Sequence, residues 1–280
     1  MSASGGKHAR DEYRRIAEAG TILRCLVGSG VHGLAIAEQD DRDEMGVCIE
    51  PPEYVIGLRP FDQYIYRSQP ERHRSGPGDL DLTVYSLRKW MRLALAGNPT
   101  ILLPLFVPPE HVITSTPLGA ELREMAPLII SRQAGKRFVG YLEAQRRSLL
   151  SRDGKGRDVT RPELVEKYGW DTKFGGHMVR LGVQGVELLE SGRITLPVPE
   201  PWRTAIRELR VGGHSMAWAL DMAEDLERRI TELLETSPLP DKPDYEAADK
   251  WLVDVYQRSW RNRSILDGSE VEQFGSSASS

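Results

Sequence analysis

The hydrophobic pattern of the chain changes its period part-way along, and this change constrains the fold more than any other feature. Before about residue 128, apolar residues form short branched runs or alternate with polar ones, as is typical of β-strands. Beyond that point they recur at helical spacing. We therefore expect an α+β fold, in which an N-terminal half of mixed strands and helices is followed by an all-helical C-terminal half.

The same patterns give a domain division. We expect a first domain over 1–128, a helical domain over 129–262, and a serine-rich tail over 263–280 that is too poor in apolar residues to fold. A polar stretch with several prolines and glycines, 67–78, predicts an exposed loop. Strands are predicted at 21–27, 44–49, 79–85 and 112–115, and helices at 11–19, 86–97, 132–150, 171–190, 200–210, 217–235 and 245–261.

Composition excludes several classes of protein. The longest apolar run, 101–107, is far shorter than the ~18–20 residues of a membrane span, so we expect no membrane association. The N-terminal residues lack the apolar stretch of a secretory signal. Cys25 and Cys48 are too few for a disulfide framework or a cysteine zinc site. We therefore expect a cytoplasmic protein whose two thiols are buried.

Charge is distributed unevenly. The net charge of −4 argues against a protein that coats nucleic acid along its whole surface. Segment 131–161, however, has nine Lys or Arg residues against three acids. Such a segment suits a polynucleotide acceptor, because phosphate contacts supply most non-specific affinity. A solvated basic helix face with a basic loop explains the segment equally well, and both interpretations stay open.

A glycine cluster follows the first predicted strand. Gly28-Ser29-Gly30 and Gly33 match G-x-G-x-x-G, with Glu50 about twenty residues further on, which is the pattern of a dinucleotide-binding oxidoreductase. Two features oppose this interpretation. Only seven residues, 34–40, separate the cluster from an acidic run, and the chain lacks the repeated strand–helix alternation of a doubly wound sheet.

The acidic run favours a different site. Asp41 and Asp43 lie two apart at the start of the second strand, so both carboxylates share one face, where like charges repel. A divalent metal such as Mg²⁺ removes that repulsion. Asp81, or Asp79 on the same face of the third strand, supplies a third ligand for a pair of metals. Gly28 and Ser29 offer backbone N–H groups and a hydroxyl to a triphosphate.

These residues carry a family resemblance. Gly28-Ser29 followed by Asp41-x-Asp43 resembles the signature of the DNA polymerase β-type nucleotidyltransferase superfamily. The stretch 28–47 is similar to one branch, the nucleotidyltransferases associated with RNA ligases and RNA repair. Further blocks extend the resemblance over roughly residues 20–240: they are 85–90, Gly97-Asn98-Pro99, 168–173 with His177 and Arg180-Leu181, and 187–199.

The resemblance implies a polymerase β-like mixed sheet and a two-metal enzyme. It would move a nucleoside monophosphate from an NTP to an acceptor hydroxyl, with RNA as the expected acceptor, and release pyrophosphate. Asp41 and Asp43 would bind both metals, Mg²⁺ or Mn²⁺ in its place, and Asp81 would ligate the catalytic metal and help to activate the acceptor. Gly28 and Ser29 would hold the triphosphate. Lys173, His177 and Arg180, one face of a helix at i, i+4 and i+7, would neutralise its charge.

Arg42 and Glu44 stand where the superfamily usually has apolar residues. They favour an alternative, a nucleotide-binding module on the same fold without catalytic activity. The transferred nucleotide, the acceptor class and the oligomeric state stay open at this point.

Overall fold

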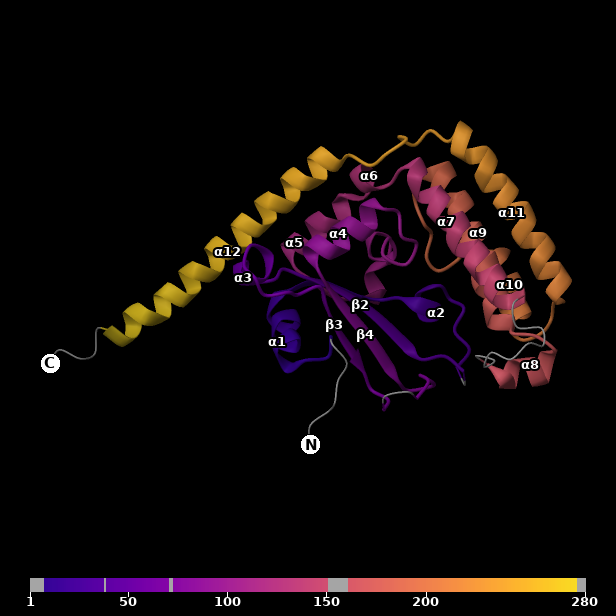
Figure 1. Ribbon diagram of the computed structural model, residues 1–280, viewed down its shortest axis with the longest axis horizontal. Helices are drawn as coiled ribbons and strands as arrows, with labels where there is room; N and C mark the ends of the chain where they lie inside the picture. Colours follow the sequence, from indigo (N-terminus) through magenta and orange to yellow (C-terminus); the bar gives the residue numbers. More distant parts are fainter. Residues whose placement is uncertain (1–7, 38, 71–72, 151–160, 276–280) are drawn as a thin grey trace.

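The computed structural model describes residues 8–37, 39–70, 73–150 and 161–275, without the side chains of 262–275. A five-stranded sheet lies at the centre, and a bundle of long helices stands beside it (Figure 1). The strands are β1 Thr21–Leu26, β2 Arg42–Cys48, β3 Gln63–Arg67, β4 Leu80–Ser86 and β5 Val112–Ser115. The helices are α1 Asp11–Gly20, α2 Gly28–Val31, α3 Pro52–Val55, α4 Leu87–Leu95, α5 Pro117–Glu124, α6 Ala126–Ile129, α7 Arg132–Leu150, α8 Pro162–Tyr168, α9 Thr172–Ser191, α10 Trp202–Arg210, α11 Met216–Thr236 and α12 Tyr245–Gly275, with short 3₁₀ turns at Leu103–Leu105 and Pro109–His111.

The sheet is mixed, as the family resemblance implies. Its order is β3-β4-β2-β1-β5, with β2 and β4 parallel and the other neighbours antiparallel. Asp43 of β2 is the register partner of Asp81 of β4. Paired residues on adjacent strands point to the same face, so this register sets two carboxylates side by side.

Helices cover the two faces of the sheet. On one face α1 buries Tyr13 and Ile16 in a cluster with Tyr64 and Leu82. On the other, α4 buries Leu87, Trp90 and Met91, which recur at helical spacing. Ser86 caps α4, because its hydroxyl accepts a hydrogen bond from the Lys89 amide at 3.2 Å.

Gly97 ends the turn after α4 with a positive φ of 77°. A Cβ there would lie 2.5 Å from Cα of Ala134 in α7, so only glycine lets α7 approach so closely. The helical half therefore packs directly on the sheet half. Phe138 and Met178 belong to the same buried cluster as Leu23 and Leu103, so the change of pattern near residue 128 divides the secondary structure but not the core.

The last helix, α12, returns to the sheet half and then extends away from it (Figure 1). The Trp260 indole donates a hydrogen bond to the backbone oxygen of Glu50 at 2.9 Å, and the Tyr256 hydroxyl accepts one from the Arg88 amide at 3.1 Å. The helix continues over 263–275, where composition predicts a disordered tail. This stretch contains no proline, so helix propagation from the anchored turns is not interrupted. Residues 276–280 of that tail lie outside the described part.

Other differences from the sequence prediction are local. β2 begins at Arg42, two residues before its predicted start, so Asp43 lies inside the strand. β3 and the short helices α3, α5, α6 and α8 were not predicted, because each is too brief to show a clear period. Both cysteines are buried and unbridged, as expected. Among the described helices, none combines the length and the apolar character needed to cross a membrane.

Candidate metal and nucleotide site

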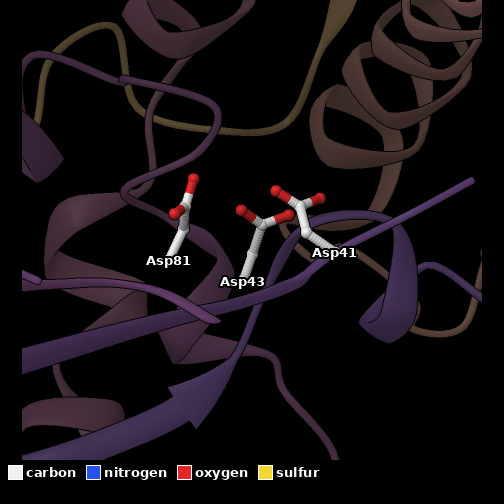
Figure 2. Close-up of side chains that lie close together, drawn as sticks. All are labelled: Asp41, Asp43 and Asp81. Carbon is white, nitrogen blue, oxygen red and sulfur yellow. The ribbon is translucent and has the colours of Figure 1, made fainter. Parts of the chain in front are cut away.

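Three carboxylates meet at one end of β2 and β4. Asp41, Asp43 and Asp81 each offer an oxygen atom, and these atoms all lie within 4.8 Å of one another. Figure 2 shows the three side chains rising on the same side of the strands. Asp43 and Asp81 meet through the parallel register, and Asp41 joins them because it precedes Asp43 by two residues. The structure thus brings together the three acids that the sequence singles out.

The arrangement is electrostatically costly without a cation. Burial raises the pKa of Asp43, and the negative charges of Asp41 and Asp81 raise it further, to about 6. Three carboxylates form a hard oxygen donor set, which suits Mg²⁺ or Mn²⁺ and would remove this repulsion. The residues present therefore fit the metals that the sequence resemblance implies.

The choice between Asp79 and Asp81 is made by their partners. Asp79 accepts hydrogen bonds from the Ser68 hydroxyl at 2.9 Å and the Gly76 amide at 3.0 Å, which close the loop before β4. Asp81 instead joins the acidic group. Only Asp81 is placed to act as the third ligand.

Gly28 lies directly against the acidic group. Its φ is +65°, and a Cβ there would lie 2.0 Å from Oδ2 of Asp43. Both facts require glycine at this position. The short turn of α2 then begins at Gly28 and Ser29, which brings bare backbone and a hydroxyl beside the carboxylates.

Arg42 and Glu44 point away from the site. Because strand residues alternate, they occupy the opposite face of β2 from Asp43. Buried Glu44 accepts hydrogen bonds from Nε of Arg24 and Nε of Arg42, each at 2.6 Å. These two charged residues therefore neutralise each other in the frame of the sheet and do not alter the acidic group.

A cavity of about 430 Å³ opens beside the acids. Gly28, Ser29, Asp41 and Asp43 line its sheet side. The helical side is basic, and it includes the three residues predicted to share one face of α9. The residues lining the helical side and the far end of the cavity include Lys173, His177, Arg180, Arg161, Arg210, Tyr141 and Gln145.

Part of the basic wall is neutralised from within by Asp40. The Arg210 guanidinium lies 2.8 Å from Oδ2 of Asp40, and Nζ of Lys173 lies 2.9 Å from its Oδ1. Burial alone would raise the pKa of Asp40, but Arg210, the Ile36 amide and Lys173 together lower it below its usual value. Lys173 is thereby held at the cavity wall by a counterion.

Arg180 has no such counterion. Its Nη1 donates hydrogen bonds to Nε2 of His32 and to Oε1 of Gln184, both at 2.9 Å. No carboxylate within the described ranges lies at ion-pair distance from it. Burial and the nearby charge of Arg210 lower its pKa to about 10. Burial and Arg180 likewise lower the pKa of His177, which keeps that ring neutral. A half-buried cation without a carboxylate partner, at a cavity wall, is a binding group for an anion.

Comparison with known proteins agrees with this geometry. The sequence model of RlaP, described as the RNA repair pathway DNA polymerase beta family, matches residues 6–254. The chain belongs to this family. No curated protein matches the sequence significantly. Among solved structures, a nucleotidyltransferase-like protein from Exiguobacterium sibiricum 255-15 is similar at 11% identity over 88% of this chain and 77% of that chain, with a TM-score of 0.29.

Membership of the RNA repair pathway DNA polymerase beta family excludes the dinucleotide-binding interpretation of the glycine cluster. The mixed sheet is not doubly wound. Glu50, which that interpretation assigns to a ribose, is fully buried, and its carboxylate accepts a hydrogen bond from the Leu87 amide at 3.3 Å. It belongs to the packing of α4 and α12.

Sequence reasoning did not assign Asp40, Arg161 or Arg210 to the site. Arg161 and Arg210 line the cavity, and Asp40 pairs with Arg210 and Lys173 at its wall. Arg161 lies 3.0 Å from Asp171, whose side chain also caps α9 by accepting hydrogen bonds from the Lys173 and Phe174 amides. No sequence signal identifies Asp40 and Arg210 as partners, because 170 residues separate them.

The basic segment 131–161 is largely structural where it is described. Its arginines are held by acids in several places, and residues 151–160, with Arg152, Lys155 and Arg157, lie outside the described part. The described ion pairs are Arg132–Asp241, Arg146–Glu227, Arg147–Glu143 and Arg161–Asp171. For Arg132, Arg146 and Arg147 these pairs favour a structural role over a track for nucleic acid, whereas Arg161 also lines the cavity.

Proposed function

We propose that this protein is a metal-dependent nucleotidyltransferase that moves a nucleoside monophosphate from an NTP to an acceptor hydroxyl, with RNA as the acceptor. The observation that carries the proposal is one cavity with two unlike walls. Three clustered carboxylates stand on one side, and Arg180, which has no carboxylate partner among the described residues, stands on the other. A metal–triphosphate complex carries the charges that complement both walls at once.

The residues divide the work by position. Asp41, Asp43 and Asp81 would hold two divalent metals, which supply Lewis-acid stabilisation of the attacking and leaving oxygens. The Ser29 hydroxyl and the backbone of Gly28 would bind the triphosphate. Arg180 and Lys173 would neutralise its β- and γ-phosphates and the pyrophosphate that leaves.

The transfer would proceed as an in-line displacement at the α-phosphorus of the NTP. The acceptor hydroxyl would pass its proton to the Asp81 carboxylate, and its oxygen would form a bond to the α-phosphorus of the NTP. The bond from that phosphorus to the bridging oxygen of the β-phosphate breaks, and pyrophosphate departs toward the basic wall. The orientation of Asp43 depends on Gly28, because any side chain at position 28 would displace the carboxylate.

A cytoplasmic location also belongs to this proposal. It is supported by Cys25 and Cys48, which are buried and are not joined by a disulfide.

The test is transfer of label from an α-labelled NTP to an RNA 3′ end in the presence of Mg²⁺ or Mn²⁺. Asp43→Asn and Asp81→Asn should each lower the rate by ~10³-fold or more, because a metal ligand acts on the transition state directly. The matched control is Asp79→Asn, which removes an equal charge from the residue that closes the loop; it should retain transfer within a few-fold.

Two outcomes contradict the proposal. Equal loss in Asp79→Asn and Asp81→Asn would refute the assignment of the third ligand. Saturable NTP binding without transfer to any acceptor would replace the enzyme with a non-catalytic nucleotide-binding module.

A further inference from the structure

A second hollow, of about 370 Å³, adjoins the nucleotide cavity. It lies between the loop that precedes β4 and the short helix α8. Arg74 and Ser75 line it from the loop, and Lys167 lines it from α8. Arg161 and Lys173 line both this hollow and the nucleotide cavity, so the two spaces are neighbours.

The third acid is connected to this second hollow. Asp41 and Asp43 line the nucleotide cavity. Asp81 instead accepts a hydrogen bond at 2.8 Å from the hydroxyl of Ser75, which lines the second hollow. The acidic group therefore stands between two spaces, with two carboxylates toward one and the third linked to the other.

Lys167 gives the second hollow an unpaired cation. Across the described ranges, no carboxylate lies at ion-pair distance from its ammonium group, which sits 5.0 Å from the ring centre of Tyr168. Glu163, one turn earlier on α8, is engaged by Arg74 of the loop at 2.7 Å. The hollow thus has an available positive charge beside a space large enough to hold a phosphate group.

We infer that the second hollow receives the end of a single-stranded nucleic acid acceptor, with a backbone phosphate on Lys167 and the terminal hydroxyl directed to Asp81. The inference rests on the proposed function, which it deepens by giving donor and acceptor separate entrances. A backbone phosphate pairs with Lys167, whereas a cationic small-molecule acceptor is repelled and a neutral one leaves that charge uncompensated. Arg161 and Lys173, shared by both spaces, separate the acceptor phosphate from the triphosphate of the donor.

The test measures binding and does not need turnover. A short RNA with a 5′ fluorophore and a free 3′ end is titrated with the full chain, and anisotropy gives its Kd at several salt concentrations. Lys167→Glu should weaken RNA binding by ~10-fold and lower the slope of log Kd against log salt by about one, because one phosphate contact is lost. ATP affinity, measured by calorimetry on the same variant, should change less than about twofold, since Lys167 does not line the nucleotide cavity.

The matched control is Lys136→Glu. Lys136 is an exposed lysine on α7 that lines neither space, so the variant makes the same change in net charge elsewhere. A DNA strand of the same sequence is a second arm. The Lys167 effect should appear with both strands, because both present the phosphate, and the tighter of the two identifies the acceptor.

Equal weakening by Lys167→Glu and Lys136→Glu would overturn the inference, because it would show only a general charge effect. A loss of ATP affinity in Lys167→Glu would also overturn it, since the two spaces would not be separate. Failure of the proposed function looks different: transfer would be absent from the wild-type chain, while the effect of Lys167→Glu on RNA binding would persist.

Discussion

Asp40 and Asp43 lie three residues apart, but their side chains have opposite electrostatic surroundings. Asp40 is buried among cations, with Arg210 and Lys173 at 2.8 and 2.9 Å, and its pKa is lowered. Asp43 lies among anions, and its pKa is raised to about 6. A charge that the protein neutralises with its own residues stabilises the fold. A charge that it leaves uncompensated marks the place of a ligand.

The same distinction holds on the basic wall of the cavity. Lys173 and Arg210 share Asp40, and Arg161 has Asp171, whereas Arg180 meets only neutral partners. We therefore expect the paired charges to determine stability and the unpaired charges to determine binding. Three tests of this distinction between paired and unpaired charges follow: two substitutions and one pH profile.

The largest effect should come from Asp40→Asn. The Asp40 side chain is 2% exposed and that of Arg210 is 4% exposed, so the substitution leaves a buried guanidinium without its charge partner. Denaturant unfolding should show a loss of about 3–5 kcal/mol. Asp41→Asn, the same change one residue along, should cost nothing or stabilise the metal-free protein, because it relieves repulsion in the acidic group.

A double variant sharpens this result. Asp40→Asn combined with Arg210→Met should lose less stability than the two single changes added together. The double variant removes both members of the pair, so no buried charge of the pair is left without its partner. If Asp40→Asn lowers the free energy of unfolding by less than about 1 kcal/mol, the Asp40–Arg210 pair does not stabilise the fold as we expect.

A smaller effect is expected from Arg180→Met, and it should appear in binding. Without its guanidinium, none of the described residues on this wall offers an unpaired cation, so the Kd of ATP with metal should rise about 10- to 100-fold. Unfolding without nucleotide should change by less than about 1 kcal/mol, because no carboxylate loses its partner. Arg228→Met, an exposed arginine of α11, is the matched control and should leave the Kd unaltered. A large loss of stability with unchanged ATP affinity would show that Arg180 stabilises the fold and does not bind the nucleotide.

The acidic group was predictable from sequence, and its electrostatic setting was not. Strand alternation places Asp41 and Asp43 on one face, and helical spacing places Lys173, His177 and Arg180 on another. The parallel pairing of β2 with β4, which brings in Asp81, is a long-range contact that no local pattern specifies. Here the family resemblance supplied what periodicity lacks.

The counterions depend on such long-range contacts too. Asp40 is the first of four acids in the run 40–44, and only the fold shows that it faces Arg210 while Asp43 joins Asp41 and Asp81. Glu44 and Arg42, which suggested an impaired site, proved to be partners on the opposite face of the sheet. β3 was missed because five residues beside a polar loop give too short a period to recognise.

The smallest effect concerns pH, and it separates Asp43 from Asp40 in the metal-free protein. The folded-state pKa of Asp43 is about 6, above its unfolded value of 3.8, so the folded state binds the proton more tightly. The stability that this group contributes is therefore lost as pH rises through 6. With allowance for partial exposure, chelator-treated protein should gain about 1–2 kcal/mol, a few degrees in Tm, between about pH 7 and pH 5.

Asp40 works in the opposite sense, because its lowered pKa gives stability that is lost only at more acidic pH, below its unfolded value of 3.8. Asp43→Asn should therefore flatten the profile between about pH 5 and pH 7 and leave the acid limb in place. If the stability of the variant changes between about pH 5 and pH 7 as steeply as that of the wild type, the repulsion is not located at Asp43. The proposed contrast between Asp40 and Asp43 would then be wrong for Asp43.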